Sequence, residues 1–358
     1  MAYTRIERLQ NAMANSGFDG ALIVSPENRL YFTQFPSSDG YLLVSAEKAV
    51  FVTDSRYVEA AEKKAVGCSV VLQTTDSTQL FELFSEMHVT RVAVEASRMN
   101  LAQYARICNA LEPMAVLADS TLDNLIAGLR SVKQPDEIEK IRAAQNIAEQ
   151  AFSHICEFIK PGKTEREVSL ELDFFMLHHG AEALSFETIA VSGENGSMPH
   201  GVPGSRKIQA GDFVTMDFGA VVDGYHSDMT RTVAVGQVSD RQKEVYYVVL
   251  SAQKALLSAL RPGLPCSEAD KVARDVIEQA GYGAYFGHAA GHGVGVEIHE
   301  FPNLSPRSKS VLTVGNVVTD EPGIYLPGEF GVRIEDMAYI TPDGCENLTA
   351  SPKELIIL

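Results

Sequence analysis

Acidic residues recur at matched positions in the second part of this 358-residue chain, where they could hold divalent cations. Asp217 and Asp228 lie on either side of Asp223-Gly224, a pair that is typical of a two-residue hairpin turn. If that pair forms the turn, Asp217 lies opposite Thr230, and the alternation of side chains along a strand puts both aspartates on one sheet face. Converging carboxylates repel each other unless a proton or a cation lies between them. A divalent cation would resolve this conflict.

The chain supplies two further acids and several imidazoles. Glu321 occupies the place of Asp217 in an internal repeat, and Glu335 follows Arg333 on a predicted strand, so that these last two side chains share one face. Four histidines also occur in this part of the chain: His200 lies in a loop, and His288, His292 and His299 lie close together in sequence. A carboxylate-rich site with an imidazole favours Mn²⁺, Co²⁺, Fe²⁺ or Zn²⁺ over metals that prefer thiolates. Bridging carboxylates favour two ions.

An internal repeat is expected to position these acids. A Lys/Arg-Pro-Gly motif ends a predicted helix at Gly162 and again at Gly263, 101 residues later. Residues 211–219 and 315–323 then share the pattern Gly-x-apolar-Val-Thr-x-acid-x-Gly at an offset of 104. We therefore predict two helix-helix-strand units that form a pseudo-twofold α+β domain over residues 131–358, with a carboxylate at the same strand position in each half.

Residues 1–130 follow a different pattern, in which short apolar and β-branched runs alternate with helical stretches such as 57–65. The expected strands are 21–24, 41–44, 49–52, 70–72 and 92–94. Pro135 then begins an amphipathic helix that runs over about residues 136–159. We predict an α/β N-terminal domain over residues 1–130, followed by the duplicated domain over 131–358.

Composition excludes several classes of partner. Thirty basic residues face 47 acidic ones, and the net charge of −17 argues against binding to nucleic acid or to an anionic membrane surface. No apolar run approaches the roughly 18 residues of a membrane span, and the first residues lack the apolar segment of a signal peptide. The five cysteines include no Cys-x-x-Cys pair and are expected to be small hydrophobic residues. We expect a cytoplasmic protein.

Six motifs together resemble a known family. They are Met216-Asp217-Phe218-Gly219, Ser227-Asp228-Met229-Thr230-Arg231-Thr232, Gly291-His292-Gly293-Val294-Gly295, His299-Glu300, Glu321-Pro322-Gly323-Ile324-Tyr325 and Gly331-Val332-Arg333-Ile334-Glu335-Asp336. On these motifs, residues 131–358 resemble the pita-bread fold of the metallopeptidase family that includes methionine aminopeptidase. Residues 1–130 resemble the N-terminal domain of its aminopeptidase P, prolidase and creatinase branch.

The resemblance implies a peptidase that binds two divalent ions. Mn²⁺ or Co²⁺ is expected, with Zn²⁺ or Fe²⁺ as alternatives, and Asp228 and Glu335 are expected to bridge the ions. The full set of implied ligands is Asp217, Asp228, His292, Glu321 and Glu335. The implied reaction is hydrolysis of the bond between an N-terminal residue and a following proline, by a hydroxide that bridges the two metals. A homodimer is a family expectation.

The resemblance also implies roles for other side chains. Glu321 is expected to accept a proton from the attacking water and later to donate it to the leaving amine. His200 and His299 are expected to act in catalysis and to hydrogen-bond the substrate and the developing oxyanion. His288 is expected to help hold the substrate, and Arg333 to position groups at the mouth of the site and contact the substrate.

Two alternative functions stay open. They are an aminopeptidase of other specificity on the same fold and a catalytically silent binding protein, which would lack metal ligands. The shared motifs do not separate an Xaa-Pro dipeptidase from an Xaa-Pro aminopeptidase.

Two residues depart from the family pattern. Asp320 stands where an apolar residue or Thr is usual, and we expect it to face away from Glu321. Phe330 replaces a glycine, and we expect it to shape the substrate mouth.

Overall fold

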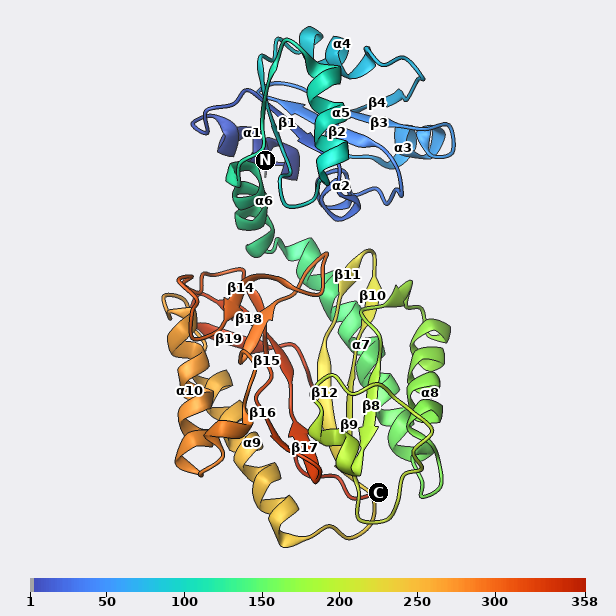
Figure 1. The fold of residues 1–358 in the computed structure, drawn as a ribbon, viewed down its shortest axis with the longest axis vertical. Coiled ribbons are helices and arrows are strands. Elements are labelled where there is room, and N and C mark those ends of the chain that lie inside the picture. Colours follow the sequence, from blue (N-terminus) through green and yellow to red (C-terminus); the bar gives the residue numbers. More distant parts are fainter. Residues whose placement is uncertain (1–2) are drawn as a thin grey trace. The chain divides into compact units, whose positions relative to one another are not determined.

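Two units follow one another along the chain, the first ending at Arg130 and the second beginning at Ser131 (Figure 1). The computed structural model describes residues 3–358. Within this range no helix has both the length and the apolar character needed to cross a bilayer.

The first unit is an α/β layer around one six-stranded mixed sheet, with strand order β4-β3-β2-β1-β5-β6. Its strands are β1 (Gly20–Ile23), β2 (Tyr41–Ser45), β3 (Ala49–Thr53), β4 (Ser69–Leu72), β5 (Arg91–Val94) and β6 (Ala115–Leu117). Its helices are α1 (Arg5–Met13), α2 (Pro26–Thr33), α3 (Val58–Lys64), α4 (Gln79–Glu86), α5 (Leu101–Leu111) and α6 (Thr121–Ser131). The five predicted strands are confirmed. Strand β6 was not predicted, because its three residues are too few to establish an alternating pattern.

The second unit contains the predicted repeat. Its first half begins with helices α7 (Pro135–Phe158) and α8 (Glu165–His178), and its second half with α9 (Asp240–Ala259) and α10 (Cys266–Gln279). Gly162 and Gly263 lie between the helices of each pair with φ of 95° and 82°, which glycine adopts most readily. Their N–H groups donate hydrogen bonds of 2.8 Å to the carbonyls of Ile208 and Leu312. The two halves therefore share local hydrogen bonding as well as helix order.

The strands of the second unit lie between the two helix pairs (Figure 1). The first half contains β7 (Ala183–Leu184), β8 (Ile189–Ser192), the 3₁₀ helix η1 (Gly193–Ser197), β9 (Phe213–Phe218), β10 (Ala220–Val222), β11 (Tyr225–His226) and β12 (Met229–Ala234). The second half contains η2 (Gly283–Tyr285), β13 (Gly291–Gly293), β14 (Glu300–Leu304), β15 (Val317–Asp320), β16 (Gly323–Leu326), β17 (Phe330–Arg333), β18 (Asp336–Thr341) and β19 (Gly344–Asn347). The sheet orders are β12-β9-β8, β11-β10-β7, β14-β13-β15-β18-β19 and β16-β17.

Each helix pair buries its apolar side against a strand next to the predicted acids. Strand β9 contains Asp217, and strand β15 ends just before Glu321. Ile147 and Leu172 of the first pair pack in one core with Met216 of β9. Leu256 of α9 packs in the other core with Val318 of β15. Because apolar burial is the main favourable term in folding, these two cores hold the acid-bearing strands in place.

Two details near the second pair of acids differ from expectation. The predicted strand 331–336 divides, since β17 ends at Arg333 and β18 begins at Asp336. Between them the Glu335 N–H donates to the Thr230 carbonyl at 3.1 Å, so the chain passes from one sheet to another at this point. The prediction that Phe330 shapes the substrate mouth is wrong. Its ring is buried in the core and packs edge-to-face on Phe213, with centroids 5.7 Å apart.

Candidate metal centre

A tight hairpin sets the positions of the first two acids. Asp223 and Gly224 both have positive φ, 48° and 73°, as a two-residue type I′ turn requires. Val222 pairs with Tyr225, and Asp217 pairs with Thr230. This is the predicted register.

A glycine allows the hairpin to close next to Asp228. A Cβ atom on Gly219 would lie 1.9 Å from the carbonyl oxygen of Ser227, so no other residue fits without moving the backbone. The close approach brings Asp228, the next residue, to the same side as Asp217, and both carboxylates line one cavity of about 580 Å³.

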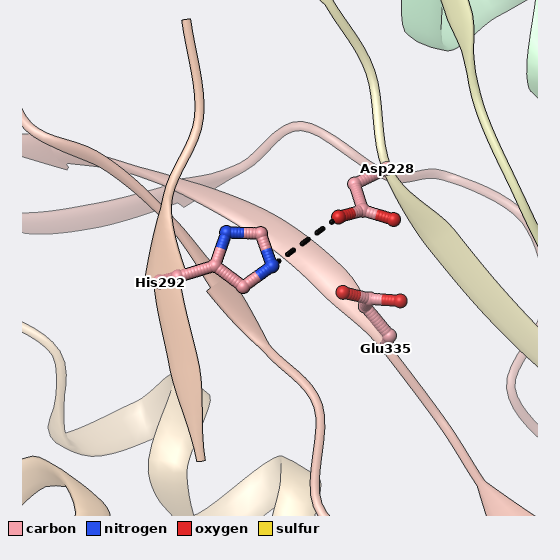
Figure 2. Close-up of side chains that lie close together, drawn as sticks. All are labelled: Asp228, His292 and Glu335. Atoms are coloured by element: carbon pink, nitrogen blue, oxygen red, sulfur yellow. Dashed lines mark ion pairs between the residues drawn. The ribbon is translucent and has the colours of Figure 1, made fainter. Parts of the chain in front are cut away.

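Three side chains from separate segments meet in that cavity. Asp228, His292 and Glu335 each offer a ligand atom, and these atoms all lie within 4.8 Å of one another (Figure 2). The Nε2 atom of His292 is 3.5 Å from Asp228 Oδ2 and 3.5 Å from Glu321 Oε1. Its other ring nitrogen, Nδ1, lies 3.0 Å from the Gly293 carbonyl, to which an N–H there would donate. That bond would leave the Nε2 lone pair directed at the carboxylates, as a metal ligand requires.

Asp217 provides an independent indication that this cavity suits a cation. Its Oδ2 accepts a 2.5 Å hydrogen bond from Arg333. Its Oδ1 is buried and has no hydrogen-bond partner in the described part of the chain. Because a buried carboxylate oxygen without a partner is costly, this atom fits a divalent ion held between Asp217 and its neighbours. The residues present therefore fit the implied metals.

Arg333 and Thr230 hold the carboxylates of Asp217 and Glu335 in place through hydrogen bonds. Besides Asp217, the Arg333 guanidinium donates to the Tyr325 hydroxyl at 2.8 Å, to Thr230 Oγ1 at 3.1 Å and to a backbone carbonyl. Thr230 Oγ1 in turn donates to Glu335 Oε2 at 2.6 Å. One arginine thus connects an acid of the first half with an acid of the second.

The carboxylates strongly affect one another's protonation. Burial, followed by the negative charges of Asp217 and Glu321, raises the pKa of Asp228 well above its usual range. Burial and the Asp228 charge do the same to the pKa of Glu335, and burial is also the main cause that raises the pKa of Glu321. Charged carboxylates buried this close together repel one another, and divalent ions would neutralise them.

The remaining predicted histidines line the same cavity. His200, His288 and His299 all contribute to its wall. The rings of His292 and His299 pack edge-to-face with centroids 4.3 Å apart. The Nε2 atom of His288 is 2.9 Å from the Tyr325 hydroxyl. Burial lowers the pKa of His288 and of His299, which favours neutral imidazoles at neutral pH. All nine predicted site residues therefore meet at one cavity.

Several residues that support the metal centre were not predicted from the sequence. Thr230 was placed opposite Asp217, so its position was available, but its hydrogen bond to Glu335 was not foreseen. Tyr325 ends the motif that begins at Glu321, but its position in that motif does not indicate a contact with Arg333. Lys133 forms a buried ion pair with Glu300, with Nζ 3.0 Å from Oε2, beside His299. No local pattern indicates that partnership, because the two residues are far apart in sequence.

Buried carboxylates and an imidazole that meet in one cavity define a divalent-metal-binding protein. The family model of metallopeptidase family M24 matches residues 139–342, and that of the creatinase/prolidase N-terminal domain matches residues 5–132. The chain therefore belongs to metallopeptidase family M24 and carries the N-terminal domain of creatinase and prolidase. Membership implies an enzyme that uses divalent metal ions.

Three named relatives match nearly the whole chain. A solved Xaa-Pro dipeptidase of Bacillus anthracis is 44% identical, with a TM-score of 0.95 over 99% of each chain. A solved X-Pro aminopeptidase of Thermotoga maritima is 35% identical, with a TM-score of 0.91 over 97% of this chain and 100% of its own. An Xaa-Pro dipeptidase of Pyrococcus furiosus is 37% identical over 98% of this chain and 99% of its own. The two solved structures share the expected architecture, an α/β N-terminal domain followed by a pita-bread domain.

Proposed function

We propose that this protein hydrolyses the peptide bond between an N-terminal residue and a following proline. The observation that carries this proposal is the buried cluster of Asp228, His292 and Glu335, whose ligand atoms lie within 4.8 Å of one another beside the unpartnered Oδ1 of Asp217. Support for proline specificity comes from the relatives, which are named as Xaa-Pro dipeptidases and an X-Pro aminopeptidase.

The proposed metal ligands are the five predicted ones, with Mn²⁺ or Co²⁺ as the expected ions and Asp228 and Glu335 shared between them. They are Asp217, Asp228, His292, Glu321 and Glu335. When bound, two such ions lower the pKa of a water molecule and polarise the scissile carbonyl. The donor set supports this choice, because oxygen ligands with one imidazole suit these ions.

The chain's own residues would then handle the protons and the substrate. A Glu321 carboxylate oxygen takes a proton from the attacking water and later delivers it to the proline nitrogen, as the C–N bond breaks. His200 and His299 would donate hydrogen bonds to the substrate and to its developing oxyanion, with His288 positioned through Tyr325.

The test uses enzyme whose metal content has been measured after loading with Mn²⁺ or Co²⁺. We expect hydrolysis of an Xaa-Pro substrate and none of Met-Ala-Ser, and comparison of Xaa-Pro with Xaa-Pro-Yaa separates dipeptidase from aminopeptidase activity. Asp228→Asn should reduce kcat/KM at least about 10³-fold, because it removes a shared ligand. Asp343→Asn, which changes an exposed acid, serves as the matched control. A wild-type protein that binds no metal, or full activity in Asp228→Asn, would contradict the proposal.

We further propose a division of labour between the two units, with catalysis in residues 131–358 and a creatinase/prolidase-like domain over residues 1–130. We also propose a cytoplasmic homodimer. Cysteines without disulfides support a reducing compartment, since all five are free thiols. The dimer rests on the family resemblance. Light scattering on purified protein measures the assembly, and cell fractionation measures the location.

A further inference from the structure

Two buried aspartates lie on the side of the sheet away from the metal centre. Asp320 and Asp336 are direct cross-strand partners at the ends of β15 and β18, and both are fully buried. Each is the chain neighbour of a proposed ligand, since Asp320 precedes Glu321 and Asp336 follows Glu335. Because successive side chains point to opposite faces, the two aspartates face α9 while the two glutamates face the cavity. Any movement of the aspartates would therefore be passed to the ligands.

The two aspartates differ in the number of hydrogen bonds that their carboxylates accept. Asp336 accepts hydrogen bonds from Arg231, Asn347 and Lys353 at 2.8, 2.8 and 2.5 Å. The carboxylate of Asp320 has a single donor within residues 3–358, the side-chain amide of Gln253 at 2.9 Å, and its second oxygen has none.

Gln253 contacts both aspartates at once. Its Nε2 atom donates to Asp320 Oδ2 at 2.9 Å and to Asp336 Oδ2 at 3.1 Å. The side chain is fully buried on α9, and its neighbours Val249 and Leu256 are packed in the core, so the amide is held firmly in place. One amide thus spans the gap between two carboxyl groups that would otherwise face each other directly.

We propose that Gln253 is a positioning residue for the metal centre: by bridging Asp320 and Asp336 it fixes the spacing of Glu321 and Glu335. Without the amide, Asp320 loses its donor and the end of β15 moves away from β18. Glu321 would move with it, and the second half of the ligand set would no longer match two ions. Substitution of a residue that orients a metal ligand without binding the metal commonly lowers metal affinity about 10–100-fold.

The first half of the repeat provides a matched control. Gln145 of α7 is also a fully buried glutamine, and its amide contacts a residue next to a proposed ligand, Met229 beside Asp228. That contact is with a sulfur atom, 3.4 Å away, and involves no carboxylate. Gln145→Leu therefore removes a buried amide of the same kind without leaving an acid unsatisfied.

The experiment titrates metal-free protein with Mn²⁺ alone by calorimetry, after circular dichroism has shown that each variant is folded. For Gln253→Leu we expect about 10–100-fold weaker binding of at least one ion, and for Gln145→Leu a change of less than about threefold. Adding Asp320→Val to Gln253→Leu should restore binding to within about threefold of wild type, because the orphaned acid is then gone and Asp336 keeps its other donors.

Several outcomes would overturn the inference. They are wild-type affinity in Gln253→Leu, an equal loss in Gln145→Leu, or no rescue by Asp320→Val. If Gln253→Leu does not fold, Gln253→Asn shortens the side chain while keeping the amide. A smaller loss of affinity is then expected, and an unchanged affinity would count against the inference. The inference rests on the proposed metal centre, but the two fail differently. A wild-type protein that binds no Mn²⁺ defeats the proposed function, whereas two ions bound equally by wild type and variant defeat only the role of Gln253.

Discussion

Arg333 connects four groups around the metal centre, and the geometry of its guanidinium explains why an arginine stands there. Its guanidinium meets Asp217, Tyr325, Thr230 and a backbone carbonyl through three different nitrogens. Burial would lower its pKa, but the neighbouring Tyr325 and Asp217 outweigh burial and raise it. The arginine therefore stays charged and holds Asp217 in one orientation.

Arg333→Lys should weaken the site although it keeps the positive charge. A lysine ammonium is a single point donor and cannot reach the partners of a planar guanidinium simultaneously. We expect kcat/KM to fall about 10–100-fold, together with weaker metal binding measured by calorimetry. Arg142→Lys is the control, since its guanidinium pairs with Glu346 at the surface, and it should stay within about twofold. Unchanged metal affinity in Arg333→Lys would show that Asp217 does not need this support.

At this scale the sequence predicted which residues meet, but not all the contacts between them. The family resemblance supplied the full ligand set and the roles of the histidines. From the residues themselves, the four acids of the metal centre were identifiable, because the hairpin, the repeat and strand alternation bring them together. Tyr325 and Gln253 were not, because a hydroxyl or an amide acts through contacts between segments far apart in sequence. Phe330 was placed wrongly, since its neighbours gave no sign of which side of β17 faces the core.

Among the elements, the hairpin and the helix pairs followed from local rules. The Asp223-Gly224 turn determines the pairing of its strands, and Gly162 and Gly263 end the first helix of each pair. The three-residue strand β6 and the break between β17 and β18 did not follow. Both depend on neighbouring strands, and the break occurs where the Glu335 N–H reaches Thr230 of the other half.

The start of β1 offers a test of pH dependence. Asp19 precedes this strand and accepts hydrogen bonds from the backbone N–H of Arg91 at 2.7 Å and from the Thr90 hydroxyl at 2.8 Å. Burial alone would raise the pKa of Asp19, but these bonds to the carboxylate outweigh it and lower the pKa. A lowered pKa contributes stability above the unfolded value of about 3.9, and the contribution is lost as the pH falls through the folded value.

Asp19→Asn should therefore reduce the urea midpoint of unfolding at pH 6, with the difference from wild type shrinking as the pH falls below about 4. Unfolding curves between pH 3 and pH 7 measure this. Asp343→Asn should show no such trend, because that acid is exposed. A difference for Asp19→Asn that stays constant with pH would mean that the hydrogen bonds, and not the charge, carry the effect.

For the whole molecule, the net charge of −17 takes on a structural meaning. Residues 131–358 hold 32 of the 47 acids and 19 of the 30 basic residues. The four acids among the proposed metal ligands line one cavity, where divalent ions would neutralise them. Composition alone could exclude polyanionic partners, but it could not show where acidity is concentrated, because that depends on which strands become neighbours.

Metal removal should destabilise one unit and spare the other. Each unit has its own hydrophobic core, and all the proposed ligands belong to the second. A ligand at 100 times its Kd stabilises the folded state by about 2.7 kcal/mol. We expect EDTA to lower the melting temperature of one calorimetric transition and leave the other in place. Asp228→Asn should respond much less to EDTA. Two transitions that shift together, or none that shifts, would contradict this assignment.

The short turn at Asp223-Gly224 has a consequence for how this enzyme can vary. Its length sets which residues of β12 pair with β9, and a shift by one residue would exchange inward and outward side chains along the strand. A gene with a single codon inserted there would still encode every acid and histidine of the site. Thr230, and with it the hydrogen bond to Glu335, would nevertheless turn toward the core. Loop-length variation at this hairpin is therefore constrained by chemistry that takes place in the cavity, not in the turn.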